Sequence, residues 1–132
     1  MQQRINLIKH FSGLIKEMDI RNNQLRCIMT LRPSEESCEY LVKIVLHKGY
    51  KPSVWLMEPS LQLVNDKLPH HIYDFDGAGK PKLCVYHPSE WNGRMFIAES
   101  FVPWVITWLN TYEYWVLTGE WHYDEVNRRK KT

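Results

Sequence analysis

Cys84 is the residue in this 132-residue chain whose type and surroundings best fit covalent chemistry. Three histidines, His70, His71 and His87, lie in the same loop region. Lys80 and Lys82 come just before the cysteine. Neighbouring cations stabilise a thiolate, which is the form of cysteine that attacks acyl carbons. A free cysteine is, however, most often a small packed hydrophobe. The local sequence therefore leaves two interpretations of Cys84 open, a nucleophile and a buried thiol.

The other two cysteines, Cys27 and Cys38, fall in segments where apolar residues alternate, and there a packed thiol is the favoured interpretation. Three widely spaced cysteines do not form a disulfide framework. We therefore expect a reduced, cytoplasmic protein.

A metal site is a competing interpretation of the same region. Cys84 and His87 are three residues apart, and His70 and His71 lie upstream, which are ligand types that zinc accepts. A second closely spaced pair of ligands is missing, so this interpretation is the weaker one. The glycine-rich loops that bind nucleotides are also missing. We therefore expect neither a metal nor a cofactor.

The composition is that of a folded domain: 44% of the residues are hydrophobic and 24% are charged. The net charge of +2 gives no reason to expect nucleic acid as a partner. A basic run at 128–131 falls in a segment, 122–132, that we expect to be a solvated tail. No window approaches the roughly 18 apolar residues of a membrane span, and the N-terminus lacks the apolar core of a signal peptide. We therefore expect no membrane association.

The elements that must position Cys84 follow from hydrophobic periodicity. Apolar residues at helical spacing predict a helix over 2–18, within an N-terminal segment 1–20. Alternation and turn residues predict a three-stranded antiparallel meander within 24–58. The segment 59–100 is mostly irregular, which is typical of a functional loop. A second, buried helix over 101–118 has Ser100 as its expected N-cap and Gly119 as its expected C-cap.

Several motifs then match a known pattern. Gly49-Tyr50-Lys51-Pro52-Ser53-Val54-Trp55-Leu56 resembles the Tyr-Pro-x-x-Pro-Pro-x-Val-x-Phe stretch of ubiquitin-conjugating enzymes. Leu83-Cys84-Val85-Tyr86-His87-Pro88, then Trp108-Leu109, Tyr112-Glu113-Tyr114-Trp115 and Thr118-Gly119-Glu120-Trp121, are similar to the stand-alone conjugating-enzyme-like proteins of bacterial CBASS antiphage operons, the short type II form. The match covers about residues 49–121. The resemblance implies a single α+β domain of the ubiquitin-conjugating-enzyme (UBC)-like fold: an N-terminal helix, an antiparallel meander, a long active-site loop and a C-terminal helix.

The resemblance also implies a function. Cys84 would carry the C-terminus of a protein as a thioester and pass it to an amine or thiol acceptor. The carried protein would be the cGAS-like nucleotidyltransferase of the same operon, and the acceptor is not identified. The family's Asn about eight residues before the cysteine is missing here. His71 is the expected replacement in an oxyanion or acid–base role, with His87 and Asp76 as weaker alternatives.

A second interpretation comes from a different class of protein. A UBC-like domain without catalysis would act as a binding module. The missing Asn favours this interpretation, and the retention of Cys84 within its motif disfavours it.

Overall fold

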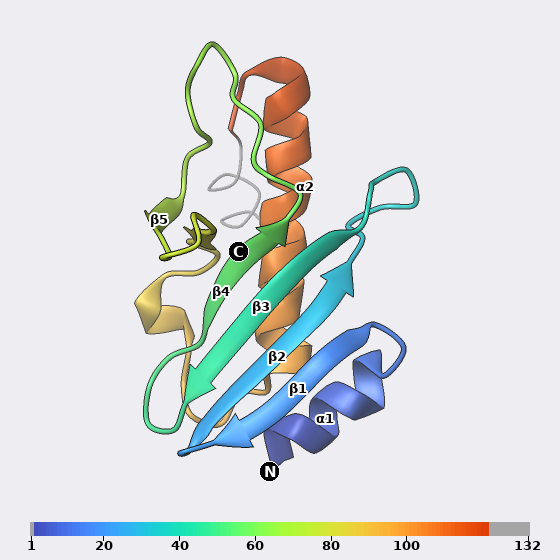
Figure 1. Ribbon diagram of the computed structural model, residues 1–132, viewed down its shortest axis with the longest axis vertical. Coiled ribbons are helices and arrows are strands. Elements are labelled where there is room, and N and C mark those ends of the chain that lie inside the picture. Colours follow the sequence, from blue (N-terminus) through green and yellow to red (C-terminus); the bar gives the residue numbers. More distant parts are fainter. Residues whose placement is uncertain (1, 122–132) are drawn as a thin grey trace.

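The computed structural model describes residues 2–121. It consists of an antiparallel sheet whose strands differ in length, with one α-helix near each end of the chain (Figure 1). Six strands form one sheet in the order β1-β2-β3-β4-β6-β5. This arrangement confirms the predicted α+β, UBC-like fold class. In chain order the elements are α1 (Gln2–Phe11), β1 (Ile15–Arg21), β2 (Gln24–Leu31), β3 (Tyr40–His47), β4 (Ser53–Glu58), β5 (Ile72–Phe75), β6 (Pro81–Leu83), a 3₁₀ turn (Pro88–Glu90), a π-helical turn (Ile97–Phe101) and α2 (Val102–Thr118).

The sheet is held by a core on one of its faces. Every second residue of β2, β3 and β4 is buried, as the alternating sequence predicts. In Figure 1, α2 passes behind these strands. Trp108 and Phe101 are the largest side chains with no exposed surface. Burial of such rings contributes strongly to stability, so α2 and the sheet fold as one unit.

The predicted helix over 2–18 is wrong in its second half. The helix ends at Phe11, and Ile15–Arg21 pairs with β2 as β1. Asn22 and Asn23 both have positive φ, 52° and 62°, and make the two-residue turn between the strands. The register of β1 shifts between Ile15 and Glu17. Such a bulge interrupts the two-residue alternation of a strand. The spacing of the apolar residues in β1 therefore resembles that of an amphipathic helix.

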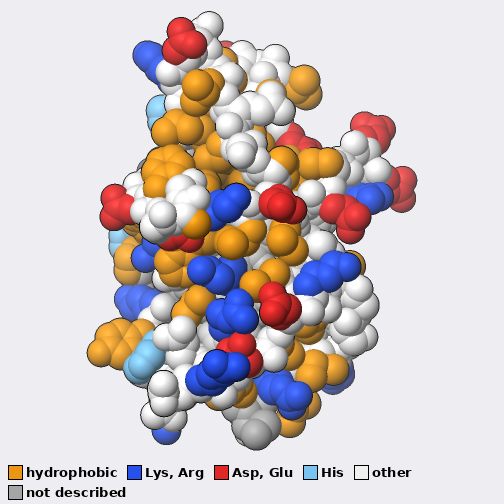
Figure 2. All heavy atoms as spheres, viewed as in Figure 1, with side chains coloured by type: hydrophobic (Ala, Val, Ile, Leu, Met, Phe, Trp, Pro, Cys, Tyr) orange, Lys and Arg blue, Asp and Glu red, His pale blue; other side chains and the backbone are white. Residues whose placement is uncertain are grey.

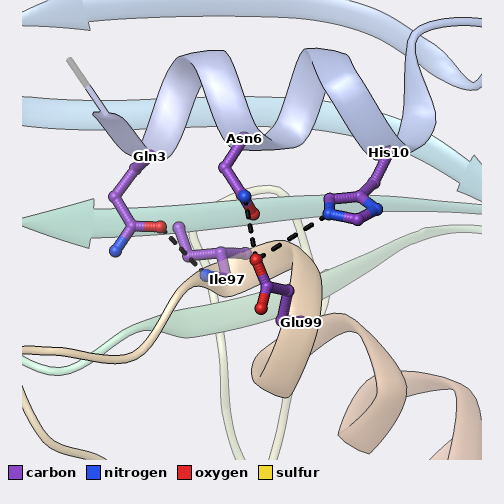
Figure 3. A network of polar contacts seen from close by, with 5 residues as sticks. All are labelled: Gln3, Asn6, His10, Ile97 and Glu99. Carbon is purple, nitrogen blue, oxygen red and sulfur yellow. Dashed lines mark hydrogen bonds and ion pairs between the residues drawn. The ribbon is translucent and has the colours of Figure 1, made fainter.

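The N-terminal helix α1 is fixed to the π-helical turn by side-chain hydrogen bonds (Figure 3). The amide of Ile97 donates to Gln3 Oε1 at 2.9 Å, and Gln3 Nε2 donates to the carbonyl of Met95 at 2.8 Å. Asn6 Nδ2 donates to Glu99 Oε2 at 2.9 Å. These bonds attach the first element of the chain to the segment that leads into α2.

The second helix has the predicted C-cap and a different start. Gly119 has a φ of 79°, and its amide donates to the carbonyl of Trp115 at 2.7 Å, which confirms the cap. The prediction of Ser100 as N-cap is wrong, because the π-helical turn continues directly into α2 and places Ser100 inside it. Pro103 stands in the first turn of α2, where its fixed φ fits the helix.

The segment 59–100 is more ordered than its composition predicts. It contains the β5–β6 hairpin, and β6 joins the sheet through the pairing of Lys82 with Trp55 of β4. Figure 1 shows this hairpin beside β4, at the far side of the sheet from β1. Among residues 2–121, no helix has the length and apolar character needed to cross a bilayer. The predicted tail 122–132 lies outside the described residues.

Candidate active site around Cys84

Cys84 is the first residue after β6, and its backbone is fixed to the neighbouring strand. Its amide donates to the carbonyl of His71 at 2.8 Å, which extends the β5–β6 pairing by one residue. The side chain is half-buried. A thiol at this position is held in place by the main chain and is still reachable from solvent.

The same carbonyl of His71 connects the cysteine to α2. Trp108, which has no exposed surface, donates from Nε1 to His71 O at 3.0 Å. His71 has a φ of 61°, and its ring stacks on Trp121 with a centroid distance of 5.7 Å. His71 therefore reaches Cys84 through its main chain, while its ring lies against an indole. The predicted acid–base role of that ring stays a prediction.

Tyr73 is a neighbour of Cys84 that the sequence analysis did not identify. Ile72 pairs with Leu83, so alternation places Tyr73, Lys82 and Cys84 on the same face of the hairpin. Interaction with the side chain of Cys84 is the main cause that raises the pKa of Tyr73 to about 12. The phenol is therefore protonated at neutral pH. The register of the hairpin is the signal that would have revealed it.

Tyr86 borders the thiol on the other side. Its hydroxyl donates to the carbonyl of Pro52 at 2.8 Å, and its ring stacks on Trp104 with centroids 5.4 Å apart. Burial, with a smaller effect from Cys84, raises the pKa of Tyr86 to about 12. Cys84 Sγ lies 4.0 Å from the carbonyl of Tyr86. Tyr86 is therefore a packed side chain.

The two lysines before Cys84 have different positions. Lys82 Nζ lies 5.2 Å from the centroid of the Tyr73 ring and 5.7 Å from that of Trp55, so its charge is on the face of the thiol. Lys80 belongs to the hairpin turn, where its amide donates to Asp76 Oδ1 at 2.8 Å. Of the two lysines that the sequence places before Cys84, Lys82 therefore has its charge on the face of the thiol.

The weaker predicted site residues, Asp76 and His87, have contacts within their own turns. Asp76 Oδ1 also accepts from the amide of Ala78 at 2.9 Å, and the bond from the Lys80 amide is the main reason that its pKa is lowered. His87 Nδ1 accepts from the amide of Ser89 at 3.1 Å and caps the 3₁₀ turn. Both side chains stabilise local structure, and their catalytic roles stay predictions.

The alternative interpretation, a metal site, has no supporting cluster of ligands in the part of the chain that the structure describes. There, no three His, Cys, Asp or Glu side chains are grouped closely enough to hold an ion. The other cysteines lie apart from this region. Cys27 is fully buried in β2, as predicted, whereas Cys38 is exposed before β3, so the prediction of a packed thiol at Cys38 is wrong.

An open groove runs beside Cys84. Its volume is about 420 Å³, and residues 49–53 form one wall. Tyr73, Lys82 and Tyr86 line the opposite side together with Leu83, the residue before the cysteine. The groove therefore leads to the residues on either side of Val85 and Cys84, namely Leu83 and Tyr86.

Two comparisons with known proteins bear on this chain. A family model described as "Type II CBASS E2 protein" matches residues 3–129, which is nearly the whole length. No curated protein shows a significant match.

Proposed function

Because the chain belongs to the family of type II CBASS E2 proteins, we propose that it is a UBC-like transferase that carries the C-terminus of a protein as a thioester on Cys84. The E2-like role in CBASS follows from the family, and the thioester chemistry is the proposal. One observation carries it: the thiol of Cys84 is half-buried, shares a face of the hairpin with Tyr73, and follows Leu83, which lines an open groove.

The reaction has two transfers. The thiolate of Cys84 attacks the activated carbonyl carbon of the incoming C-terminus, the activating group leaves with the bonding electrons, and a thioester forms. An amine or thiol of the acceptor then attacks the same carbon, and Cys84 leaves as a thiolate. The sequence contains no nucleotide-binding loop, so another protein or a preformed activated intermediate must supply the activated acyl group.

Each transfer passes through a tetrahedral oxyanion that needs a hydrogen-bond donor. The amide of Cys84 already donates to His71, and the hydroxyl of Tyr86 donates to Pro52. Tyr73 lies on the same face of the hairpin as Cys84, and its phenol stays protonated at neutral pH. We therefore assign the donor role to Tyr73. The ring of His71, and more weakly His87 and Asp76, remain proposed acid–base groups.

The proposed carried protein is the cGAS-like nucleotidyltransferase encoded in the same operon, through its C-terminal carboxyl group. The acceptor is a protein amine or thiol. This pairing rests on the family and on the resemblance of the motifs around Cys84, and it sets the choice of partner for the first experiment.

The test is a search for the covalent adduct. The chain is co-expressed with the neighbouring nucleotidyltransferase, and the products are analysed on non-reducing gels and by intact mass spectrometry. Cys84→Ala is the test variant, and Cys38→Ala is the matched control because Cys38 is the exposed cysteine away from the groove. We expect a thiol-sensitive adduct in the wild type and in Cys38→Ala, and none in Cys84→Ala.

The opposite result would favour the second interpretation. If folded wild-type protein binds the nucleotidyltransferase and forms no adduct, the domain is a non-catalytic binding module. An adduct that persists in Cys84→Ala and is lost in Cys38→Ala would show that Cys38 carries the thioester. That result would contradict the proposal directly.

A further inference from the structure

A row of alternating cations and aromatic rings crosses the exposed face of the sheet and ends beside Cys84. Lys43 of β3, Trp55 of β4 and Lys82 of β6 are paired across the strands. Lys43 Nζ lies 5.0 Å from the Trp55 centroid, and Lys82 Nζ lies between the rings of Trp55 and Tyr73. Figure 2 shows basic side chains gathered over this face of the sheet. The two ring contacts favour a position of the Lys82 ammonium between Trp55 and Tyr73.

Lys82 has its charge available for a ligand. Within residues 2–121, the ion pairs involve only His10 and Arg26 as cations, and no carboxylate lies within pairing distance of Lys82. The groove next to Leu83 is lined by Lys82 and by Lys51, and no Asp or Glu among residues 2–121 lines it. Lys51 Nζ donates to the carbonyl of Pro88 at 2.7 Å, which holds a second cation at the groove wall. The groove is therefore positively charged and lies next to the proposed nucleophile.

The positive charge of the groove favours binding of one of the two substrates of the proposed reaction over the other. An acceptor lysine is itself a cation and is repelled by a groove with two lysines. An acyl donor with carboxylate side chains near its C-terminus is attracted. Charge-assisted hydrogen bonds to a carboxylate are about twice as strong as neutral ones. The groove thus fits the donor and disfavours the acceptor.

We propose that the groove between residues 49–53 and β6 binds the C-terminal segment of the acyl donor through acidic side chains, with Lys82 as the main contact. The proposal rests on the proposed function and names the chemistry of its substrate. Lys82 and Cys84 are two residues apart along extended chain, a separation of about 7 Å. An acidic side chain within the last four residues of the donor therefore reaches Lys82 while the terminal carbonyl lies at the thiol.

The test uses peptide binding to the full chain with Cys84→Ser, so that no thioester is needed. Three fluorescein-labelled Gly/Ser peptides of ten residues carry two Glu, two Gln or two Lys within their last four positions. All are amidated, so that only their side chains differ in charge. Fluorescence anisotropy gives Kd. We expect the Glu peptide to bind about tenfold more tightly than the Gln peptide, and the Lys peptide to bind least. The difference decreases in 0.5 M NaCl.

Three substitutions locate the effect. In Lys82→Gln the Glu peptide binds no better than the Gln peptide, and Lys82→Arg keeps the preference because the charge is retained. Lys16→Gln is the control, because Lys16 is an exposed lysine of β1 at the opposite edge of the same sheet. Equal binding of the Glu and Gln peptides, or an unchanged preference in Lys82→Gln, overturns the proposal.

The two proposals fail separately. If the adduct on Cys84 forms and the peptides bind without regard to charge, the groove assignment is wrong and the thioester function stands. If the charge preference depends on Lys82 and no adduct forms, the groove assignment stands and the thioester function is wrong.

Discussion

Tyr73 lies on the same face of the β5–β6 hairpin as Cys84, and its interaction with the thiol raises the pKa of Tyr73 to about 12. The hairpin is anchored from behind, since the amide of Cys84 and the indole of Trp108 both donate to the carbonyl of His71. The buried helix α2 thus fixes the backbone that carries Cys84. In a UBC-like fold without the family's Asn about eight residues before the cysteine, Tyr73 is the donor that we propose.

The first prediction is that Tyr73→Phe slows thioester formation on Cys84 and leaves the fold intact. Removing one oxyanion donor typically costs about 10²–10³ in rate, and we expect at least about tenfold here because Tyr73 is half exposed. The rate is measured by quenched-flow and non-reducing gels. Tyr86→Phe is the control: its hydroxyl donates to Pro52, so the loss should appear in stability, by about 1 kcal/mol, and less in rate. Equal rates in wild type and Tyr73→Phe would exclude the donor role.

The second prediction concerns pH. The pKa of Tyr73 is raised from 10.0 in the unfolded chain to about 12 in the fold, so the folded state holds this proton more tightly. Its contribution to stability is therefore complete below pH 10 and is lost as the pH rises from 10 to 12. In Cys84→Ala the interaction with the thiol is gone, and the pKa of Tyr73 should move back toward 10. NMR titration of the labelled tyrosine Cζ follows it. A pKa that stays near 12 in Cys84→Ala would show that the thiol is not its partner.

The sequence predicts well what depends on local periodicity. Alternation in β2, β3 and β4 predicts both the strands and their buried faces, because each strand has one face on the core. Gly119 is predictable as a cap because its left-handed conformation favours glycine. Cys84 stays a prediction, made from its motif, the flanking histidines and the two lysines before it, Lys80 and Lys82.

What the sequence does not predict depends on pairing between distant segments. Tyr73 becomes a neighbour of Cys84 only through the register in which Ile72 pairs with Leu83. The bulge in β1 gives a helical spacing to a strand, and only the pairing with β2 decides between the two. The π-helical turn before α2 likewise replaces a cap at Ser100 because residues 97, 98 and 101 are buried there.

The third prediction is that the attachment of α1 depends more on Gln3 than on Glu99. The two bonds of Gln3 go to main-chain groups and are partly buried, whereas Glu99 is exposed (Figure 3). We expect Gln3→Ala to cost about 1–3 kcal/mol and Glu99→Ala less than about 1 kcal/mol. Urea unfolding gives the totals, and hydrogen exchange within α1 locates them. Gln2→Ala, an exposed neighbour, is the control. A larger loss in Glu99→Ala would reverse the assignment.

The fourth prediction tests the cap of α2. Gly119 has a φ of 79°, and an alanine there would cost about 1 kcal/mol, because a Cβ disfavours left-handed backbone. Gly13 is the matched control, since its backbone is not left-handed and a Cβ would meet nothing within 4 Å. We expect Gly119→Ala to lower the thermal midpoint by several degrees and Gly13→Ala to change it little. Equal effects would remove the conformational explanation.

The last prediction orders the three cysteines by reactivity. Burial raises the pKa of Cys27 from 9.0 to about 11, so its thiolate at pH 8 is about 100-fold scarcer than that of an unperturbed thiol, and it has no exposed surface. Cys38 is exposed and Cys84 half-buried. Iodoacetamide should therefore modify Cys38 and Cys84 in the folded protein and reach Cys27 only in denaturant, as read by peptide mass spectrometry. Substrate bound in the groove should protect Cys84 and leave Cys38 unaffected, because Leu83, the residue before Cys84, lines the groove and no neighbour of Cys38 in the sequence does. Protection of both cysteines would point to a general change in the fold, and labelling of Cys27 at the rate of Cys38 would contradict the buried position of β2.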